Sequence, residues 1–311
     1  MHTQAILLSE PEVLSLSTLS LTDPEEGDVI VDVAFSGIST GTERLLWSGE
    51  MPHFPGMGYP LVPGYETVGK VVDAGKGSDL TSGQSVFIPG SQCFKEARGL
   101  FGGAASRLVV PASRIARIPD GLGEQGVLLA LAATAHHAIG GGSQLPDLIV
   151  GHGVLGRLIA RLTCALGDAP QVWEQEAGRR SGGIGYSVCA PDEDERRDYD
   201  VILDASGNVG VLDQVIARLA PRGEVVLAGF YAERISFDFP PAFMREARLR
   251  IAAEWRPEDL EAVSRLVADG RLSLDGLITH RGHPADASTA YRTAFTDAGC
   301  LKMIFDWRSL S

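Results

Sequence analysis

The chain has 311 residues, of which 44% are hydrophobic and 22% are charged. This composition is typical of globular proteins and is sufficient for two domains with separate cores, so extensive disorder is excluded. The formal charge of −13, with no run of Lys or Arg longer than a pair, is unfavourable for phosphate-rich partners, and we expect no binding to nucleic acid.

The composition also indicates where the protein works. The longest apolar run, residues 126–139, is too short to cross a bilayer, so we expect no integral membrane segment. Residues 1–12 have neither a basic start nor a long apolar run, and they predict no signal peptide. The four cysteines are widely separated and form no C-x-x-C pair, which favours a reducing compartment. We therefore predict a cytoplasmic protein.

Residues 1–118 contain short segments rich in Val and Ile, separated by Gly, Pro and Asp. These segments lie at 5–8, 28–38, 66–75, 84–90 and 105–118. Short β segments bounded by turn residues are typical of a compact barrel or sandwich. We therefore predict a β-rich first domain.

From residue 119 onwards, strands alternate with helices. The apolar patterns predict strands and helices in the order 147–153 (strand), 154–167 (helix), 171–175 (strand), 199–207 (strand), 209–220 (helix) and 223–230 (strand). This alternation predicts a parallel, doubly wound sheet, and the fold class is therefore α/β.

A glycine motif lies at the first junction between strand and helix in this second half. Gly151, Gly153 and Gly156 form G-x-G-x-x-G, and the helix that follows opens with Val154 and Leu155. In dinucleotide-binding proteins these glycines allow a tight turn, a close approach to the pyrophosphate and close packing of helix on strand. The helix N-terminus then presents free N–H groups to the phosphates.

An acidic residue, Glu174, ends the next predicted strand at about the spacing that such sites require. Its carboxylate can accept hydrogen bonds from both ribose hydroxyls and would repel a 2′-phosphate, which favours NAD over NADP. The neighbouring pair Arg179–Arg180 weakens that preference. The alternative is a glycine-rich turn that binds no ligand.

Two further loops follow parallel strands, at the edge of the sheet where ligands bind in such folds. One contains Ser206 and Gly207, and the other contains Gly229 and Phe230. We expect both to border the nicotinamide half of the cofactor. The alternative is that they are ordinary turns between strand and helix.

The order of these parts, with a short β-rich return at 299–307, resembles the medium-chain dehydrogenase/reductase superfamily, which includes the zinc alcohol dehydrogenases. The resemblance covers nearly the whole chain. It implies a GroES-like domain over 1–118, completed by 275–311, and a Rossmann nucleotide-binding domain over 119–274.

The expected zinc ligands are missing from the matching motifs. "SGISTGTERL" resembles the superfamily's first metal-ligand loop, with Ser39 where Cys is usual. "PGYE" resembles its "GHE", with Tyr65 in the His position and Glu66 retained. The segment at 90–103, where a four-cysteine structural lobe would lie, holds only Cys93. Hydroxyl groups that stay protonated are poor zinc ligands, so we expect no metal at either position.

Hydride transfer without zinc still needs a group that takes the hydroxyl proton. The resemblance places Tyr65 where the metal would hold the substrate oxygen. Other candidates for catalysis or substrate binding are Glu66, Ser39, Thr40, His136 and His137. The two histidines could instead be structural, or could form a cryptic zinc site with Glu66. The resemblance also implies that Thr134 lies near the nicotinamide and that Lys302 reaches the cofactor phosphates.

A more specific resemblance runs over the whole chain and is carried by the zinc-free stretch 36–72, the glycine loop and residues 228–255. These segments are similar to a family that oxidises the 1-hydroxyethyl group on ring A of a bacteriochlorophyllide to acetyl, with NAD as acceptor. The resemblance implies a tetrapyrrole substrate. The alternatives are a zinc-free quinone or enoyl reductase, and a regulatory protein that binds nucleotide without catalysis. A homodimer through the edge strand near 248–255 would fit the superfamily.

Overall fold

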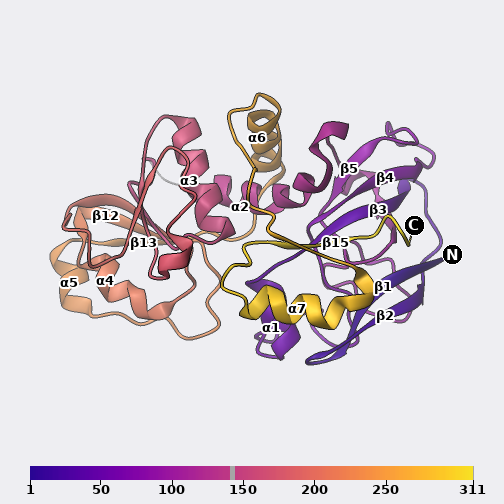
Figure 1. Ribbon diagram of the computed structural model, residues 1–311, viewed down its shortest axis with the longest axis horizontal. Helices are drawn as coiled ribbons and strands as arrows, with labels where there is room; N and C mark the ends of the chain where they lie inside the picture. The colour runs from indigo at the N-terminus through magenta and orange to yellow at the C-terminus, as the bar shows by residue number, and fades with distance from the viewer. Residues whose placement is uncertain (141–143, 311) are drawn as a thin grey trace. The chain divides into compact units, whose positions relative to one another are not determined.

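The computed structural model describes residues 1–140 and 144–310, which form two compact units (Figure 1). The first unit comprises Met1–Ala130 together with the C-terminal stretch from Leu277, and the second comprises Leu131–Gly276. The division therefore falls twelve residues beyond the expected boundary at 118/119, because the short helix η2 (Asp120–Leu128) contacts β-strands of the first unit.

The first unit is built mainly from antiparallel strands. Its sheet has the order β14-β15-β3-β4-β5-β7. Strand β6 pairs with residues 28–32 of β3, and β15 pairs with residues 35–38. Strands β1 and β2 form a separate hairpin. The strands are β1 (His2–Glu10), β2 (Val13–Ser20), β3 (Asp28–Ile38), β4 (Thr67–Asp73), β5 (Ser85–Ile88), β6 (Arg107–Pro111), β7 (Ala116–Arg117), β14 (His280–Gly282) and β15 (Met303–Asp306).

Strand β3 shows why this sequence forms the sheet. Val29, Val31 and Val33 alternate with more exposed residues and are buried in the core, as the two-residue repeat of a strand requires. Strand β15 pairs antiparallel with β3, with Met303 opposite Ile38, so the C-terminal return completes the first unit's sheet.

Helices cover parts of this unit. They are α1 (Thr42–Ser48), η1 (Ala112–Arg114), η2 (Asp120–Leu128), η5 (Pro284–Asp286) and α7 (Ala287–Thr296), while α2 (Leu129–Gly140) continues into the second unit. Figure 1 shows α7 alongside α1, where the Tyr291 hydroxyl donates a hydrogen bond to Glu43 at 2.5 Å.

The second unit is a six-stranded parallel sheet in the order β10-β9-β8-β11-β12-β13. This is the strand order of a doubly wound, dinucleotide-binding sheet, with the topological switch point between β8 and β11. The strands are β8 (Leu148–Val150), β9 (Gln171–Trp173), β10 (Ser187–Cys189), β11 (Tyr199–Asp204), β12 (Leu219–Leu227) and β13 (Arg248–Ile251).

The helices of this unit are α3 (Val154–Leu166), η3 (Ala177–Arg179), η4 (Val209–Val211), α4 (Leu212–Ile216), α5 (Phe239–Met244) and α6 (Pro257–Ala268). The helix expected over 209–220 is shorter than predicted. It ends at Ile216, because Leu219 already pairs with Tyr199 in the sheet and Pro221 disfavours helical backbone at the residue before it.

Across the described residues, the structure has no helix long and apolar enough to cross a membrane.

Candidate functional site

Three glycine-containing loops meet at the carboxyl ends of β8, β11 and β12. A Cβ atom placed on Gly151 would lie 3.3 Å from Cα of Ser206. A Cβ atom on Gly229 would lie 2.7 Å from the backbone nitrogen of Gly207. The structure therefore brings together the three loops that the sequence singled out, at the edge of the sheet where ligands bind in this class of fold.

The glycine motif has the backbone geometry of a phosphate-binding turn. Gly151 has a φ of +95°, and a Cβ on Gly156 would lie 1.9 Å from the Gly151 carbonyl oxygen, so both positions require glycine. Gly153 differs, because a Cβ there would meet no protein atom within 4 Å. Its small size is not needed for packing and fits the close approach of a ligand. Helix α3 begins at Val154, with Leu155 in its first turn, and no side chain caps it.

Glu174, just after β9, lies against this turn. One carboxylate oxygen accepts a hydrogen bond from the His152 N–H at 3.0 Å, and the other accepts from the Glu176 N–H at 2.9 Å. The carboxylate is therefore held beside the glycine turn, where a ribose adjoining the bound pyrophosphate would lie. An uncapped helix, an unfilled glycine position and a fixed carboxylate all fit a dinucleotide.

A buried network, not anticipated from the sequence, holds the next segment in place. His152 shares hydrogen bonds with the Arg179 carbonyl at 2.7 Å and with the Tyr186 hydroxyl at 2.9 Å. Burial lowers the pKa of His152 to about 4, so its ring is neutral. Arg157 donates to the carbonyls of Arg179, Ser181, Gly182 and His152. His152 is thus a structural residue of the loop.

For two other proposed cofactor residues, the structure gives the position in the fold and the exposure. Phe230 follows β12 and is 52% exposed. Thr134 lies on α2 and is partly buried. Contacts of these side chains with a nicotinamide stay predictions.

In the first unit, the two residues that the resemblance aligns with zinc ligands contact each other. The hydroxyls of Ser39 and Tyr65 share a hydrogen bond of 2.8 Å. The Tyr65 ring packs edge-on against Phe101, with 4.9 Å between ring centroids. Burial and the negative charge of Glu66 raise the pKa of Tyr65 well above its usual range, so the phenol stays protonated. Thr40 is exposed.

A buried ion pair fixes the backbone on both sides of this hydroxyl pair. The Lys302 ammonium group donates to the two carboxylate oxygens of Glu66 at 2.7 and 3.0 Å and to the Ile38 carbonyl at 3.1 Å. Ile38 precedes Ser39 and Glu66 follows Tyr65, so one cation connects the two segments. Gly37 makes room for this arrangement, because a Cβ there would lie 2.2 Å from a Glu66 oxygen. The contact of Lys302 with cofactor phosphates stays a prediction.

A second buried acid, Glu43, was missed at the sequence level. It is 1% exposed, accepts a hydrogen bond from the Ser39 N–H at 3.3 Å and accepts another from Tyr291 at 2.5 Å. Burial and the nearby Glu66 carboxylate raise the pKa of Glu43 to about 8. A capping motif does not predict it, because α1 begins at Thr42 after Gly41 without a side-chain cap and Glu43 bonds Ser39, four residues earlier.

We expect the substitution Glu43→Gln to change how stability depends on pH. Glu43 keeps its proton in the folded protein up to about pH 8, whereas the unfolded chain releases it near 4.5. The contribution of Glu43 to stability is therefore complete below pH 4.5 and falls as pH rises to about 8, by up to about 1.4 kcal/mol per pH unit. The neutral amide has no such loss. Melting temperatures across this range should show the variant gaining on the wild type as pH rises, and a constant difference would contradict the assignment.

His136 and His137, on α2, both contact Asp259 of helix α6 in the second unit. Their Nδ1 atoms lie 2.7 and 2.9 Å from the two carboxylate oxygens of Asp259. A carboxylate can only accept, so each Nδ1–H donates and each Nε2 keeps its lone pair in the neutral ring. The structure therefore supports either a structural role for this cluster or a histidine base oriented by Asp259.

Each expected ligand of the cryptic metal set has a partner within its own unit. Glu66 pairs with Lys302 in the first unit, and His136 and His137 pair with Asp259 in the second. Within the described residues, no three or more His, Cys, Asp and Glu side chains are grouped so that they could hold a metal ion.

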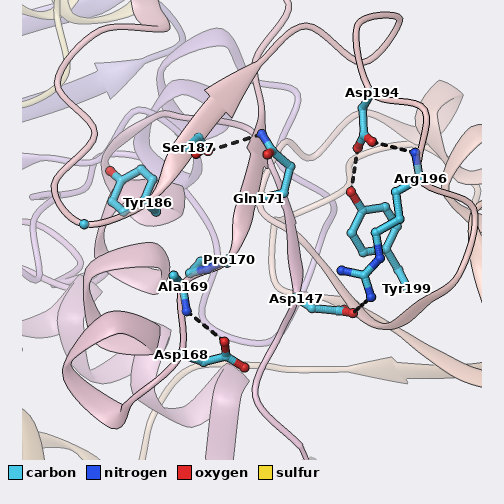
Figure 2. Close-up of a pocket in the computed structure, with 11 residues that line it drawn as sticks. Asp147, Asp168, Ala169, Pro170, Gln171, Tyr186, Ser187, Asp194, Arg196 and Tyr199 are labelled. Atoms are coloured by element: carbon cyan, nitrogen blue, oxygen red, sulfur yellow. Dashed lines mark hydrogen bonds and ion pairs between the residues drawn. The ribbon is translucent and has the colours of Figure 1, made fainter.

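The cavity drawn in Figure 2 lies elsewhere on the second unit, at the amino ends of the parallel strands. It has a volume of about 890 Å³ and is lined by Asp147 before β8, Gln171 at the start of β9 and Tyr199 at the start of β11. Its charged groups bond one another, as Asp147 does with Arg196 at 2.7 Å. Since ligands of such sheets bind at the carboxyl ends, this cavity is separate from the nucleotide loops.

Comparison with known proteins agrees with this geometry. Residues 25–120 match the alcohol dehydrogenase GroES-like domain family. The whole chain is similar in structure to acetophenone reductase from Geotrichum candidum in complex with NAD, with a TM-score of 0.83 and 18% identity over 98% of this chain and 97% of that one. The fold is therefore that of the medium-chain dehydrogenases.

Two curated relatives specify the family. The 2-desacetyl-2-hydroxyethyl bacteriochlorophyllide A dehydrogenase of Rhodobacter capsulatus is 58% identical over 99% of both chains. The protein of the same name from Cereibacter sphaeroides is 55% identical, also over 99% of both chains. The chain belongs to this family of dehydrogenases.

Proposed function

We propose that this protein oxidises the 1-hydroxyethyl group of a bacteriochlorophyllide to an acetyl group, with NAD as the acceptor. The observation that carries the proposal is the hydrogen bond between the hydroxyls of Ser39 and Tyr65, the two residues that the resemblance aligns with zinc ligands. The names of the two curated relatives support the substrate. Turnover of the hydroxyethyl pigment that depends on NAD tests it.

When bound, the nicotinamide accepts a hydride from the carbon that carries the hydroxyl group. The chain's own part is to hold the substrate oxygen and to remove its proton. We propose that Tyr65 Oη contacts the substrate oxygen while Ser39 Oγ orients the phenol. Because the Tyr65 phenol is protonated, it acts as a relay: it accepts the substrate proton as it passes its own to Ser39 Oγ, and Ser39 releases its own hydroxyl proton to solvent water. The alternative base is His136 or His137, oriented by Asp259.

Three features support NAD over NADP. The Glu174 carboxylate lies beside the glycine turn and would repel a 2′-phosphate. Arg180 is engaged with the carbonyls of Glu174 and Gln175 at 2.9 Å. The Arg179 carbonyl accepts hydrogen bonds from Arg157 and His152, and these bonds fix the segment that carries Arg179 and Arg180.

We expect Glu174→Ala to raise the KM for NAD about tenfold and to change kcat much less, because the lost hydrogen bonds serve binding of the ribose in ground and transition states alike. Initial rates at varied NAD and NADP test this. Glu176→Ala is the matched control, since Glu176 contacts the Glu174 carboxylate only through its backbone. An unchanged KM for NAD in the Glu174 variant would remove the ribose assignment.

The two alternatives make different predictions. A quinone or enoyl reductase should prefer NADPH and should reduce a conjugated double bond rather than oxidise the pigment. A regulatory protein should bind nucleotide tightly without oxidising any alcohol. The Ser39–Tyr65 pair favours the dehydrogenase, since a protein that only binds nucleotide needs no such pair.

We also propose a homodimer through the second unit. Strand β13 is at the edge of the parallel sheet, and an uncovered edge offers unpaired N–H and C=O groups. Nearby apolar side chains are unusually exposed: Phe239 (66%), Phe243 (65%), Met244 (76%) and Ile251 (75%). Pairing of β13 with its copy about a two-fold axis would bury both features. Light scattering should give the mass of two chains, and Ile251→Lys should give monomers.

For the location, we propose the cytoplasm, because the four cysteines are all free thiols in the structure. Cell fractionation with antibodies tests it.

A further inference from the structure

An arginine without a carboxylate partner lies at the rim of an apolar cluster that reaches Tyr65. The cluster consists of buried residues, among them Met51 and Leu61, and of partly exposed side chains around them. The partly exposed members are Trp47, Phe54, Met57, Tyr59, Leu100 and Phe101. The apolar loop of residues 51–60 thus packs on its own unit, yet it leaves aromatic and sulfur-containing surface open to solvent.

Arg98 is built into this surface by its backbone. Its N–H donates to the Pro60 carbonyl at 3.0 Å, and its carbonyl accepts from the Val62 N–H at 2.8 Å. The guanidinium lies against the backbone of Gly58, where a Cβ would be 3.1 Å from its central carbon. The absence of a side chain at Gly58 therefore leaves room for the guanidinium against the loop.

The guanidinium is largely unused. Among the described residues its hydrogen-bonding partner is the Gly56 carbonyl, at 3.4 Å, and no carboxylate forms an ion pair with it. A guanidinium has five N–H donors arranged to grip a carboxylate. Arg98 is also close to the reaction centre along the chain, since Phe101, which touches the Tyr65 ring, is three residues away and hence at most about 10 Å distant.

The proposed substrate has the complementary chemistry. A bacteriochlorophyllide is a flat, apolar macrocycle whose propionate side chain is not esterified, so it carries one carboxylate. We propose, resting on the function given above, that Arg98 binds this carboxylate while the macrocycle lies on the partly exposed cluster. The site then selects the free acid over the esterified pigment, in a protein whose net charge of −13 would otherwise repel it.

The test compares two pigments and three variants. The pigments are the 1-hydroxyethyl free acid and its methyl ester, and the variants are Arg98→Ala, Arg98→Lys and Arg114→Ala. Arg114 is the matched control, being an exposed arginine of the same unit on η1. We expect the wild type to show a KM about tenfold lower for the acid than for the ester. Arg98→Ala should raise the KM for the acid to that of the ester, and Arg114→Ala should keep the preference of the wild type. Arg98→Lys should recover part of the preference.

The outcomes separate the inference from the function. If the wild type oxidises both pigments with the same KM, the function stands and the carboxylate contact is overturned. If Arg98→Ala raised the KM for both pigments by the same factor, Arg98 would have a packing role, and the carboxylate contact would again be overturned. Oxidation of neither pigment by the wild type would contradict the proposed function itself.

Discussion

The variant Tyr65→Phe should lose turnover by about 100-fold or more, with a much smaller change in the KM for either substrate. The ring keeps its edge-on contact with Phe101, so the surrounding fold is preserved. What is lost is the hydroxyl that bonds Ser39 and, in the proposed mechanism, the substrate oxygen. Steady-state rates with the hydroxyethyl pigment and NAD measure this.

Tyr199→Phe is the matched control, because that phenol bonds Asp194 at the amino ends of the parallel strands, away from the nucleotide loops. Its turnover should be close to that of the wild type. A near-normal rate in Tyr65→Phe would contradict the role of Tyr65 and would assign removal of the substrate proton to His136 or His137. In that case Asp259→Asn should change the pH dependence of kcat, since Asp259 orients both rings.

The variant Lys302→Met should lower the free energy of unfolding by about 3–5 kcal/mol, because it leaves Glu66 buried without its counter-charge. Both side chains are almost completely buried, so water cannot replace the missing cation. In a chain of this size the loss should lower the melting temperature by about 5–8 °C. Differential scanning calorimetry measures the effect.

The double variant Lys302→Met with Glu66→Gln separates the ion pair from the shape of the core. It should recover most of the lost stability, because no unpaired charge is left buried. If the double variant were as unstable as Lys302→Met, the ammonium bond to the Ile38 carbonyl, and not the charge pair, would be the main contribution.

Much of the second unit could be predicted from the sequence. Its strands and helices alternate with clear apolar periods, and backbone geometry requires glycine at positions 151 and 156. The meeting of the three loops followed from the rule that carboxyl ends of parallel strands share one edge. The early end of the helix after Val209 was not predicted, because strand pairing at Leu219 overrides local helical preference.

The arrangement around Tyr65 could be predicted only in part. Ser39 and Tyr65 were expected near each other from the resemblance to metal-ligand motifs. The partners of the buried acids were not, since Glu43 pairs with Tyr291 and Glu66 with Lys302, each more than 200 residues away in the chain. Such contacts depend on the C-terminal return, and no local pattern specifies them.

The most direct test of the proposed function is a spectrum. Protein freed of exchangeable metal with a chelator is mixed with the 1-hydroxyethyl bacteriochlorophyllide and NAD, and the visible absorption is followed over time. Conjugation of the new acetyl group with the macrocycle should shift the long-wavelength band to the red. We predict a shift that requires NAD and survives the chelator treatment. Tight nucleotide binding with no shift, with either NAD or NADP, would contradict the account.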